Sequence, residues 1–162
     1  MKARFMILLT VSALVLMLDQ ATKIYVDRSM ALHSSITVIE NFFNITYLRN
    51  KGAAFGILAD SKFRLPFFIV VSTVAVGVIF VVIKKLREDQ KLAVYSLSLI
   101  LSGALGNLID RVRLGEVIDF LYFHWYEHYW PAFNVADSAI CIGVFLLAID
   151  MYLEERREKK AR

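Results

Sequence analysis

Four stretches of the chain consist mainly of apolar residues, and most of the charged residues lie between them. Residues 66–83 and 92–109 each run for 18 positions without a charged side chain, which is enough for a membrane-spanning helix. The first stretch begins at residue 5 and continues past Asp19, and the last is centred on residues 138–149. The pattern predicts transmembrane helices over about 5–24, 66–83, 92–112 and 136–153.

Two of these stretches allow another interpretation. The first, preceded by Lys2 and Arg4, is similar to a secretory signal peptide, but no small-residue cleavage site follows it. The last has only 12 uncharged residues, a length also found in buried or interfacial helices. Basic residues cluster at 2–4, 84–91 and 156–162, and four spans place all three clusters on the cytoplasmic side. We therefore expect four spans, with both termini cytoplasmic.

The segment between the first two predicted helices, residues 25–65, shows no helical pattern. Residues 35–38 and 44–48 alternate and are rich in β-branched side chains, with turn signals at 40–41 and 50–52. The small residues of 52–56 indicate either a tight turn or a close approach of another backbone. We expect a single-domain, all-α integral membrane protein with four transmembrane helices and a small extracytoplasmic β-sheet insertion after the first helix.

Composition supports lipid as the surrounding medium. Hydrophobic residues make up 58% of the 162 positions, and the mean hydropathy is +0.57, more apolar than a soluble domain of this size. The net charge of +4 comes from basic residues beside the apolar runs, which fits membrane topology better than nucleic-acid binding. The single cysteine, Cys141, lies in an apolar run and is expected to be buried and structural.

Polar residues gather near the outer ends of the predicted helices. They are Asp19, Lys23, Asn107, Asp110, Arg111, Asp119, Asn134 and Asp137. Charged groups near hydrocarbon are costly and usually serve a function. A transporter is disfavoured, because an ion pathway would distribute such groups through the full thickness of the membrane.

Each group also has a structural interpretation. Asp19 and Lys23, four residues apart, can form an ion pair on one helix face. The polar residues of the third helix can form a hydrogen-bonded cluster within the bundle. Asn134 and Asp137 precede an apolar helix, where either can cap its free N–H groups. Capping would explain one of these two residues but not both, and it does not account for Asp119. Two carboxyl groups that share a proton can activate water.

The string His124-Trp125-Tyr126-Glu127-His128 matches the H-x-x-E-H pattern of inverted zinc proteases. That pattern requires a helix that presents both histidines on one face. Here the string lies in an aromatic stretch, residues 121–130, which we expect to be a loop at the membrane surface. We interpret the match as a coincidence and expect no metal site.

Five motifs resemble those of one bacterial family, the lipoprotein (type II) signal peptidases. They are Asp19-Gln20-Ala21-Thr22-Lys23, Asn50-Lys51-Gly52-Ala53-Ala54-Phe55-Gly56, Gly103-Ala104-Leu105-Gly106-Asn107-Leu108-Ile109-Asp110-Arg111, Gly115-Glu116-Val117-Ile118-Asp119-Phe120 and Phe133-Asn134-Val135-Ala136-Asp137-Ser138. The resemblance covers nearly the whole chain and implies an aspartic endopeptidase of the inner membrane, with its active site near the outer face. Such an enzyme removes the signal peptide from diacylglyceryl-modified prolipoproteins, before the lipidated cysteine.

The resemblance also implies roles for individual residues. Asp119 and Asp137 match the catalytic pair. The residues that match or neighbour positions lining or supporting the site are Asn50, Asn107, Arg111, Asn134, Asp110, Asp19 and Lys23. The family is the target of globomycin-type inhibitors. We expect membrane lipids and a lipid-modified prolipoprotein as partners, no cofactor and no nucleic acid, and a monomer.

Overall fold

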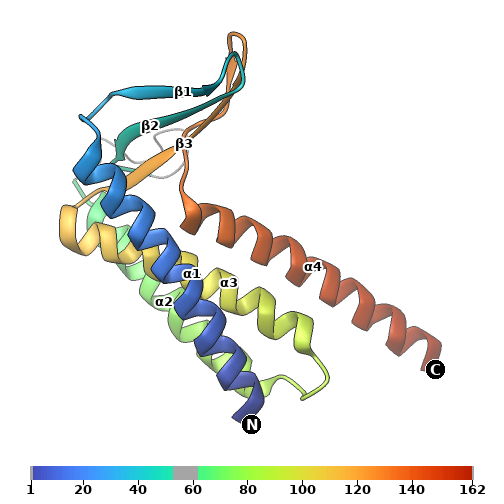
Figure 1. Ribbon diagram of the computed structural model, residues 1–162. Coiled ribbons are helices and arrows are strands. Elements are labelled where there is room, and N and C mark those ends of the chain that lie inside the picture. The colour runs from blue at the N-terminus through green and yellow to red at the C-terminus, as the bar shows by residue number, and fades with distance from the viewer. Residues whose placement is uncertain (1, 53–61, 162) are drawn as a thin grey trace.

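The computed structural model describes residues 2–52 and 62–161, which form four long helices and a small antiparallel sheet (Figure 1). The helices are α1 (Lys2–Ser29), α2 (Arg64–Lys85), α3 (Lys91–Leu114) and α4 (Val135–Ala161). All four are long and apolar enough to cross a membrane. The predicted four-helix membrane fold is confirmed. Helices α2 and α3 extend a little beyond their predicted limits, whereas α1 continues to Ser29 instead of 24 and α4 to Ala161 instead of 153.

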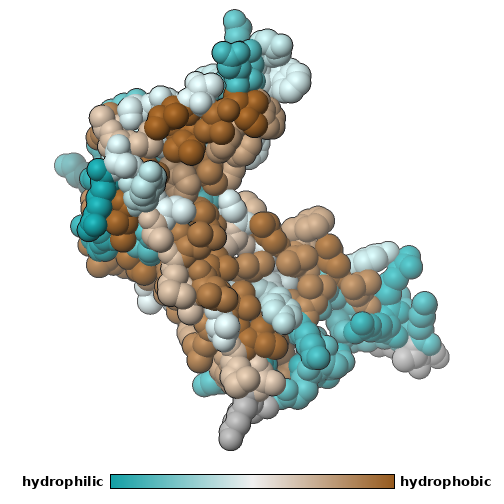
Figure 2. Space-filling view, in the orientation of Figure 1, coloured by the Kyte–Doolittle hydropathy of each residue, from teal (hydrophilic) through white to brown (hydrophobic). Residues whose placement is uncertain are grey.

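Helix α3 forms the centre of the bundle. In its most apolar 18-residue window, 61% of the residues are buried, against 11% to 22% in the other three helices. Those three keep large apolar side chains exposed, as lipid-facing helices do. In Figure 2, hydrophobic side chains cover the middle of the helices, and hydrophilic ones gather where α4 ends. The helices are therefore arranged for a lipid environment around one buried helix.

Two glycines let α3 and α4 pack closely. A methyl carbon added to Gly103 would lie 2.3 Å from the carbonyl oxygen of Ala136, and one added to Gly143 would lie 2.7 Å from that of Ser96. Small residues at such positions allow helix backbones to approach within a membrane. The contact at Gly103 holds the first turn of α4 against the half of α3 that contains Asn107.

The sheet contains more of the chain than the sequence pattern predicted. Its strands pair in the order β1 (Ser35–Ile39), β2 (Phe43–Asn50), β3 (Val117–Trp125) and β4 (His128–Tyr129). The first two come from the predicted insertion, but β3 and β4 come from the segment between α3 and α4. The prediction of a loop over 121–130 was therefore wrong. Aromatic residues are common both at membrane surfaces and in strands, so this stretch fits a loop and a hairpin equally well.

Aromatic stacking explains why this segment forms a strand. The ring of Phe123 stacks on Phe43 with centroids 4.6 Å apart and on Phe133 at 5.8 Å. Aromatic pairs across strands stabilise a sheet beyond their buried area.

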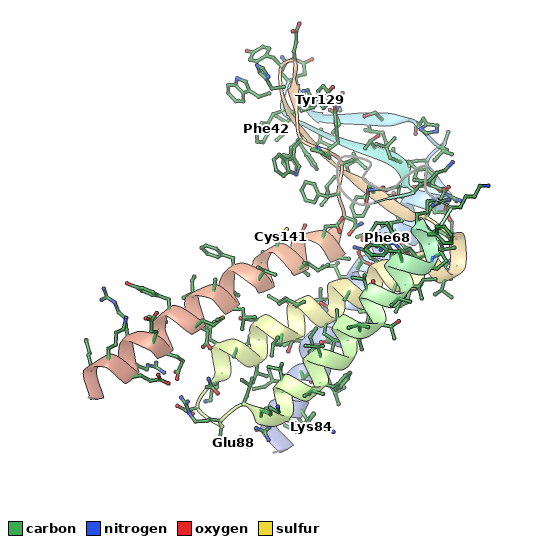
Figure 3. All side chains as sticks on the ribbon, turned by 180° about the vertical axis from the view of Figure 1, so that it is seen from behind. Phe42, Phe68, Lys84, Glu88, Tyr129 and Cys141 are labelled. Atoms are coloured by element: carbon green, nitrogen blue, oxygen red, sulfur yellow. The ribbon has the colours of Figure 1, made fainter. Side chains whose placement is uncertain are left out.

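The far end of the sheet carries Phe42 and Tyr129, while Lys84 and Glu88 lie at the opposite end of the molecule (Figure 3).

The sheet is joined to the helices through the end of α1. Arg49 of β2 forms an ion pair with Asp27 of α1 at 3.0 Å, and the Tyr47 hydroxyl donates a hydrogen bond to the same carboxylate. On the face of β3 opposite Asp119, Ile118 and Phe120 are buried in a cluster with Val26 and Tyr47. This contact fixes the orientation of β3 relative to α1.

Helix α3 ends at Leu114, and β3 begins close behind it at Val117. Gly115 has a φ of 73°, a left-handed conformation that favours glycine, and its N–H bonds the carbonyl oxygen of Arg111. An irregularity in β2 between Ile45 and Leu48 then places Leu48 opposite Asp119. Such bulges redirect side chains next to functional sites.

We predict that Gly103→Ala destabilises the protein by about 1–3 kcal/mol, because its methyl group would overlap the backbone of α4. Gly77→Ala on α2 is the matched control, since a methyl group there has no neighbour within 4 Å and alanine favours a helix. Thermal unfolding in detergent should show a lower Tm for the first variant and no loss for the second. Equal Tm values for both variants would contradict this account of the packing.

Candidate active site

The two aspartates singled out in the sequence lie on the same pocket. Asp119 is on β3 and is 3% exposed, and Asp137 is half-buried in the first turn of α4. The pocket has a volume of about 420 Å³, and both residues line it. The surface is hollowed between the sheet and the start of α4 (Figure 2). Residues 18 positions apart in sequence therefore share one cavity.

Asp119 is held by two side-chain amides. Asn50 Nδ2 donates to one carboxyl oxygen at 3.0 Å, and Asn134 Nδ2 donates to the other at 2.8 Å. Asn50 is opposite Val117 in the sheet, so it reaches Asp119 diagonally across the two strands. Burial, together with the negative charge of Asp137, raises the pKa of Asp119 to about 7 from its ordinary 3.8.

Asn134 and Asp137 form a reciprocal cap at the start of α4. The Asp137 N–H donates to Asn134 Oδ1 at 2.9 Å, and the Asn134 N–H donates to Asp137 Oδ2 at 3.3 Å. This is the geometry of a capping box. The expectation that capping would explain only one of the two residues was therefore wrong, but each residue also has a polar atom that bonds within the site. Asn134 Nδ2 contacts Asp119, and Asp137 Oδ1 accepts a hydrogen bond of 2.7 Å from Asn107 Nδ2.

Behind the pocket lies a buried ionic cluster. The Lys23 ammonium contacts carboxyl oxygens of Asp19 at 3.0 Å and Asp110 at 2.9 Å, and the Asn107 carbonyl oxygen at 3.0 Å. Lys23, Asp19 and Asp110 are each at most 1% exposed. The ion pair and the polar cluster considered from the sequence are therefore parts of one network between α1 and α3.

The carboxyl groups of Asp19 and Asp110 also bond to the backbone of the two elements that carry Asp119 and Asp137. Asp19 accepts a hydrogen bond of 2.8 Å from the Ala136 N–H in the first turn of α4. Asp110 accepts one of 3.2 Å from the Ile118 N–H, next to Asp119 on β3. The cluster thus holds the first residues of both β3 and α4 in place.

Arg111 contributes a positive charge to the pocket lining. Its guanidinium donates to the backbone carbonyl oxygens of Gly52 at 3.3 Å and Asn107 at 3.4 Å. It also lies 4.6 Å from the ring centroid of Phe68. Gly52 thus contacts a side chain of α3, and its own N–H donates to Asn50 Oδ1 at 2.9 Å, as in an Asx turn. Residues 53–56 of that segment lie outside the described part of the chain.

The apolar wall of the pocket was not predicted. It consists of Trp130, Pro131, Ala132, Phe133, Ile140 and Cys141. Cys141 was expected to be buried but is exposed, on α4 facing the sheet (Figure 3). Because it follows Asp137 by four positions, helical periodicity alone could have placed both on one face. A second cavity of about 500 Å³ shares Asn50 and Asp119 with the first.

The zinc-protease pattern does not adopt the required geometry. Its residues lie on the β3–β4 hairpin, where His124 is opposite Tyr129 and His128 is opposite Trp125. The two histidines therefore belong to neighbouring register positions, whose side chains point to opposite faces of the hairpin. Among residues 2–52 and 62–161, no group of three metal-ligating side chains is close enough to hold an ion.

The fold and the site together define a multi-pass membrane protein with two hydrogen-bonded carboxyl groups in a pocket at one end of its helices. The sequence profile of one protein family, described as Signal peptidase (SPase) II, matches residues 11–153. The chain belongs to the signal peptidase II family and is a protease.

Comparison with individual proteins supports the assignment to this family. The lipoprotein signal peptidase of Geobacter sulfurreducens is 68% identical over 143 residues, covering 88% of this chain and 89% of the relative. That of Geobacter metallireducens is 60% identical and covers 99% of both chains. A bacterial membrane enzyme solved at 2.3 Å resolution by the in meso method superimposes with a TM-score of 0.83 at 34% identity, covering 96% of this chain and 92% of that one.

The raised pKa of Asp119 predicts how stability depends on pH. Between about pH 4 and 7 the folded protein retains a proton that the unfolded chain releases, so the free energy of unfolding falls as the pH rises. We expect a loss of a few kcal/mol at about 1.4 kcal/mol per pH unit, measured as a falling Tm in detergent. The Asp119→Asn variant should lack this fall. The idea fails if wild type and variant show the same slope.

Proposed function

We propose that the protein is a membrane aspartic endopeptidase that removes the signal peptide from diacylglyceryl-modified prolipoproteins, cutting before the lipidated cysteine. The observation that carries the proposal is the pair Asp119 and Asp137, each held by two hydrogen bonds on one pocket. The names of the relatives, lipoprotein signal peptidases, support the substrate class.

The environments of the two carboxyl groups support different roles for them. Asp119 has the raised pKa and therefore holds the shared proton near neutral pH. Asp137 lies at the N-terminus of α4, where the helix dipole and the Asn134 N–H favour an anion. We assign Asp137 as the general base and Asp119 as the general acid. Pairs of carboxyl groups in unlike environments commonly divide the chemistry in this way.

In the proposed reaction Asp137 takes a proton from water as the water oxygen attacks the scissile carbonyl carbon. Asp119 gives its proton to the carbonyl oxygen, forming a tetrahedral diol. When the C–N bond breaks, Asp137 returns its proton to the leaving amine and Asp119 regains a proton from a diol hydroxyl. Both aspartates end in their starting states, and one water is consumed.

The pocket suits a lipidated peptide. Its apolar wall continues from Phe133 to Ile140 and Cys141 along α4, a helix whose outer face is exposed and apolar. Acyl chains attached to the substrate cysteine can reach such a wall from the lipid. The second cavity, which also contacts Asp119, offers room for chain on the other side of the scissile bond.

The distribution of charge supports an orientation in the membrane. Lys84 lies at the end of the helices opposite the sheet (Figure 3). The helix bounds place Arg4, Lys85 and Arg157 at the same end. Basic segments stay on the cytoplasmic side. The proposal therefore places both termini in the cytoplasm and the pocket near the outer face of the inner membrane. We expect globomycin-type inhibitors to occupy this pocket, and a monomer to suffice for activity.

We predict that Asp119→Asn and Asp137→Asn each lower the cleavage rate of a purified diacylglyceryl-modified prolipoprotein at least 100-fold, because each removes an acid or base. Asp89→Asn, an exposed carboxyl between α2 and α3, is the matched control and should cleave at the wild-type rate. Tm measurements on all three would show that the inactive variants are folded. Retained cleavage in either site variant would contradict the proposal.

The zinc alternative makes the opposite prediction. Cleavage by the aspartic pair should be unaffected by a chelator such as EDTA, and His124→Ala should remain active, because His124 belongs neither to the pair nor to its hydrogen-bond donors. The measurement is the initial rate with and without chelator. Loss of activity that added zinc restores would favour the histidine site instead.

A further inference from the structure

The Asn107 side chain lies between the buried lysine and one of the two aspartates. Its carbonyl oxygen accepts hydrogen bonds from Lys23 Nζ at 3.0 Å and Asn134 Nδ2 at 3.3 Å. Its amide nitrogen donates to Asp137 Oδ1 at 2.7 Å. Asn107 is 7% exposed, so water has little access to these atoms.

The orientation of this amide is determined by its neighbour. An ammonium group has only donors, so the oxygen and not the nitrogen of Asn107 must face Lys23. A reversed amide would place its N–H groups against the ammonium and its oxygen against the Asp137 carboxylate. Both contacts would be repulsive, and in a buried site neither could be relieved by water.

We propose that Lys23 is a positioning residue: by occupying the side-chain carbonyl oxygen of Asn107, it directs the amide nitrogen to Asp137 Oδ1. This inference rests on the proposed function, in which Asp137 is the base. It gives the lysine a part in the reaction although Lys23 does not line the pocket.

The charged surroundings favour an effect through the amide over one through space. The groups around Asp137 are Asp119 on β3, Arg111 and Asp110 on α3, and Lys23 and Asp19 on α1. Two carboxylates surround the one ammonium, so this cluster presents no excess of positive charge to Asp137. Lys23 therefore acts on Asp137 by setting the direction of the Asn107 N–H.

The test removes the lysine without leaving unpaired charges. Lys23→Met alone would bury two unpaired carboxylates, so it is combined with Asp19→Asn and Asp110→Asn. In this triple variant the amide oxygens of the new asparagines can still accept from the Ala136 and Ile118 N–H groups. The readout is the pH profile of kcat/KM on a diacylglyceryl-modified prolipoprotein in detergent, with Tm measured alongside.

We expect the acidic limb of the triple variant to move up by about one pH unit, because a directed hydrogen bond to the charged form is weakened. We also expect kcat to fall about 10-fold with little change in KM. Gln20→Met is the matched control: it contacts Asp19 and Asp110 but not Asn107. It should lower the Tm without moving the acidic limb. A triple variant with a lower Tm and a wild-type pH profile would overturn the inference.

If the triple variant does not fold, a second variant tests the Asn107–Asp137 hydrogen bond on which the inference depends. Asn107→Asp keeps an oxygen for Lys23 and replaces the donor to Asp137 with an acceptor. Its acidic limb should move in the same direction, and an unmoved limb would overturn the inference. Failure of the proposed function would look different, because Asp119→Asn or Asp137→Asn would then retain cleavage.

Discussion

A lysine ammonium group that is only 1% exposed must find acceptors inside the protein, and Lys23 finds them on two helices. Its partners Asp19 and Asp110 then use their remaining capacity to bind the N–H groups of Ala136 and Ile118. One buried charge therefore fixes α1 to α3 and sets the starting points of α4 and β3. Removing one member of such a cluster leaves a buried charge unpaired, which is far more costly than never having formed the cluster.

The two aspartates differ because the elements that carry them differ. Asp119 lies on a strand buried between α1 and the pocket, and its donors are the neutral amides of Asn50 and Asn134. Asp137 lies in the first turn of a helix, where backbone N–H groups and the helix dipole favour its anion. Asn134 bonds to both residues, so the cap of α4 and the spacing of the pair are one structural feature. Each carboxyl group is thereby restrained without a direct bond to a positive charge.

Three helices could be predicted from the sequence because their apolar runs are long enough to span a membrane. The fourth could be predicted because it places all three basic clusters on one side. Strand β3 could not, because its apolar and polar residues do not alternate strictly and its aromatic side chains fit a membrane-surface loop equally well. Its partner β2 lies about 70 residues earlier, and no local pattern reports such a pairing. The apolar wall around Cys141 was missed for a related reason: a residue in an apolar helix can face lipid, core or pocket.

The sequence by itself determined that the chain spans a membrane, and it singled out the polar residues that are too costly to lie there without a reason. It also identified the family, through motifs that are weak singly and specific together. Only the tertiary structure decided how those residues divide into a pair at the pocket and a cluster behind it, and which atom of Asn107 faces which neighbour. The physical reason is that hydrogen-bond direction and burial depend on contacts between α1, α3, α4 and β3, and these contacts exist only after the helices have packed.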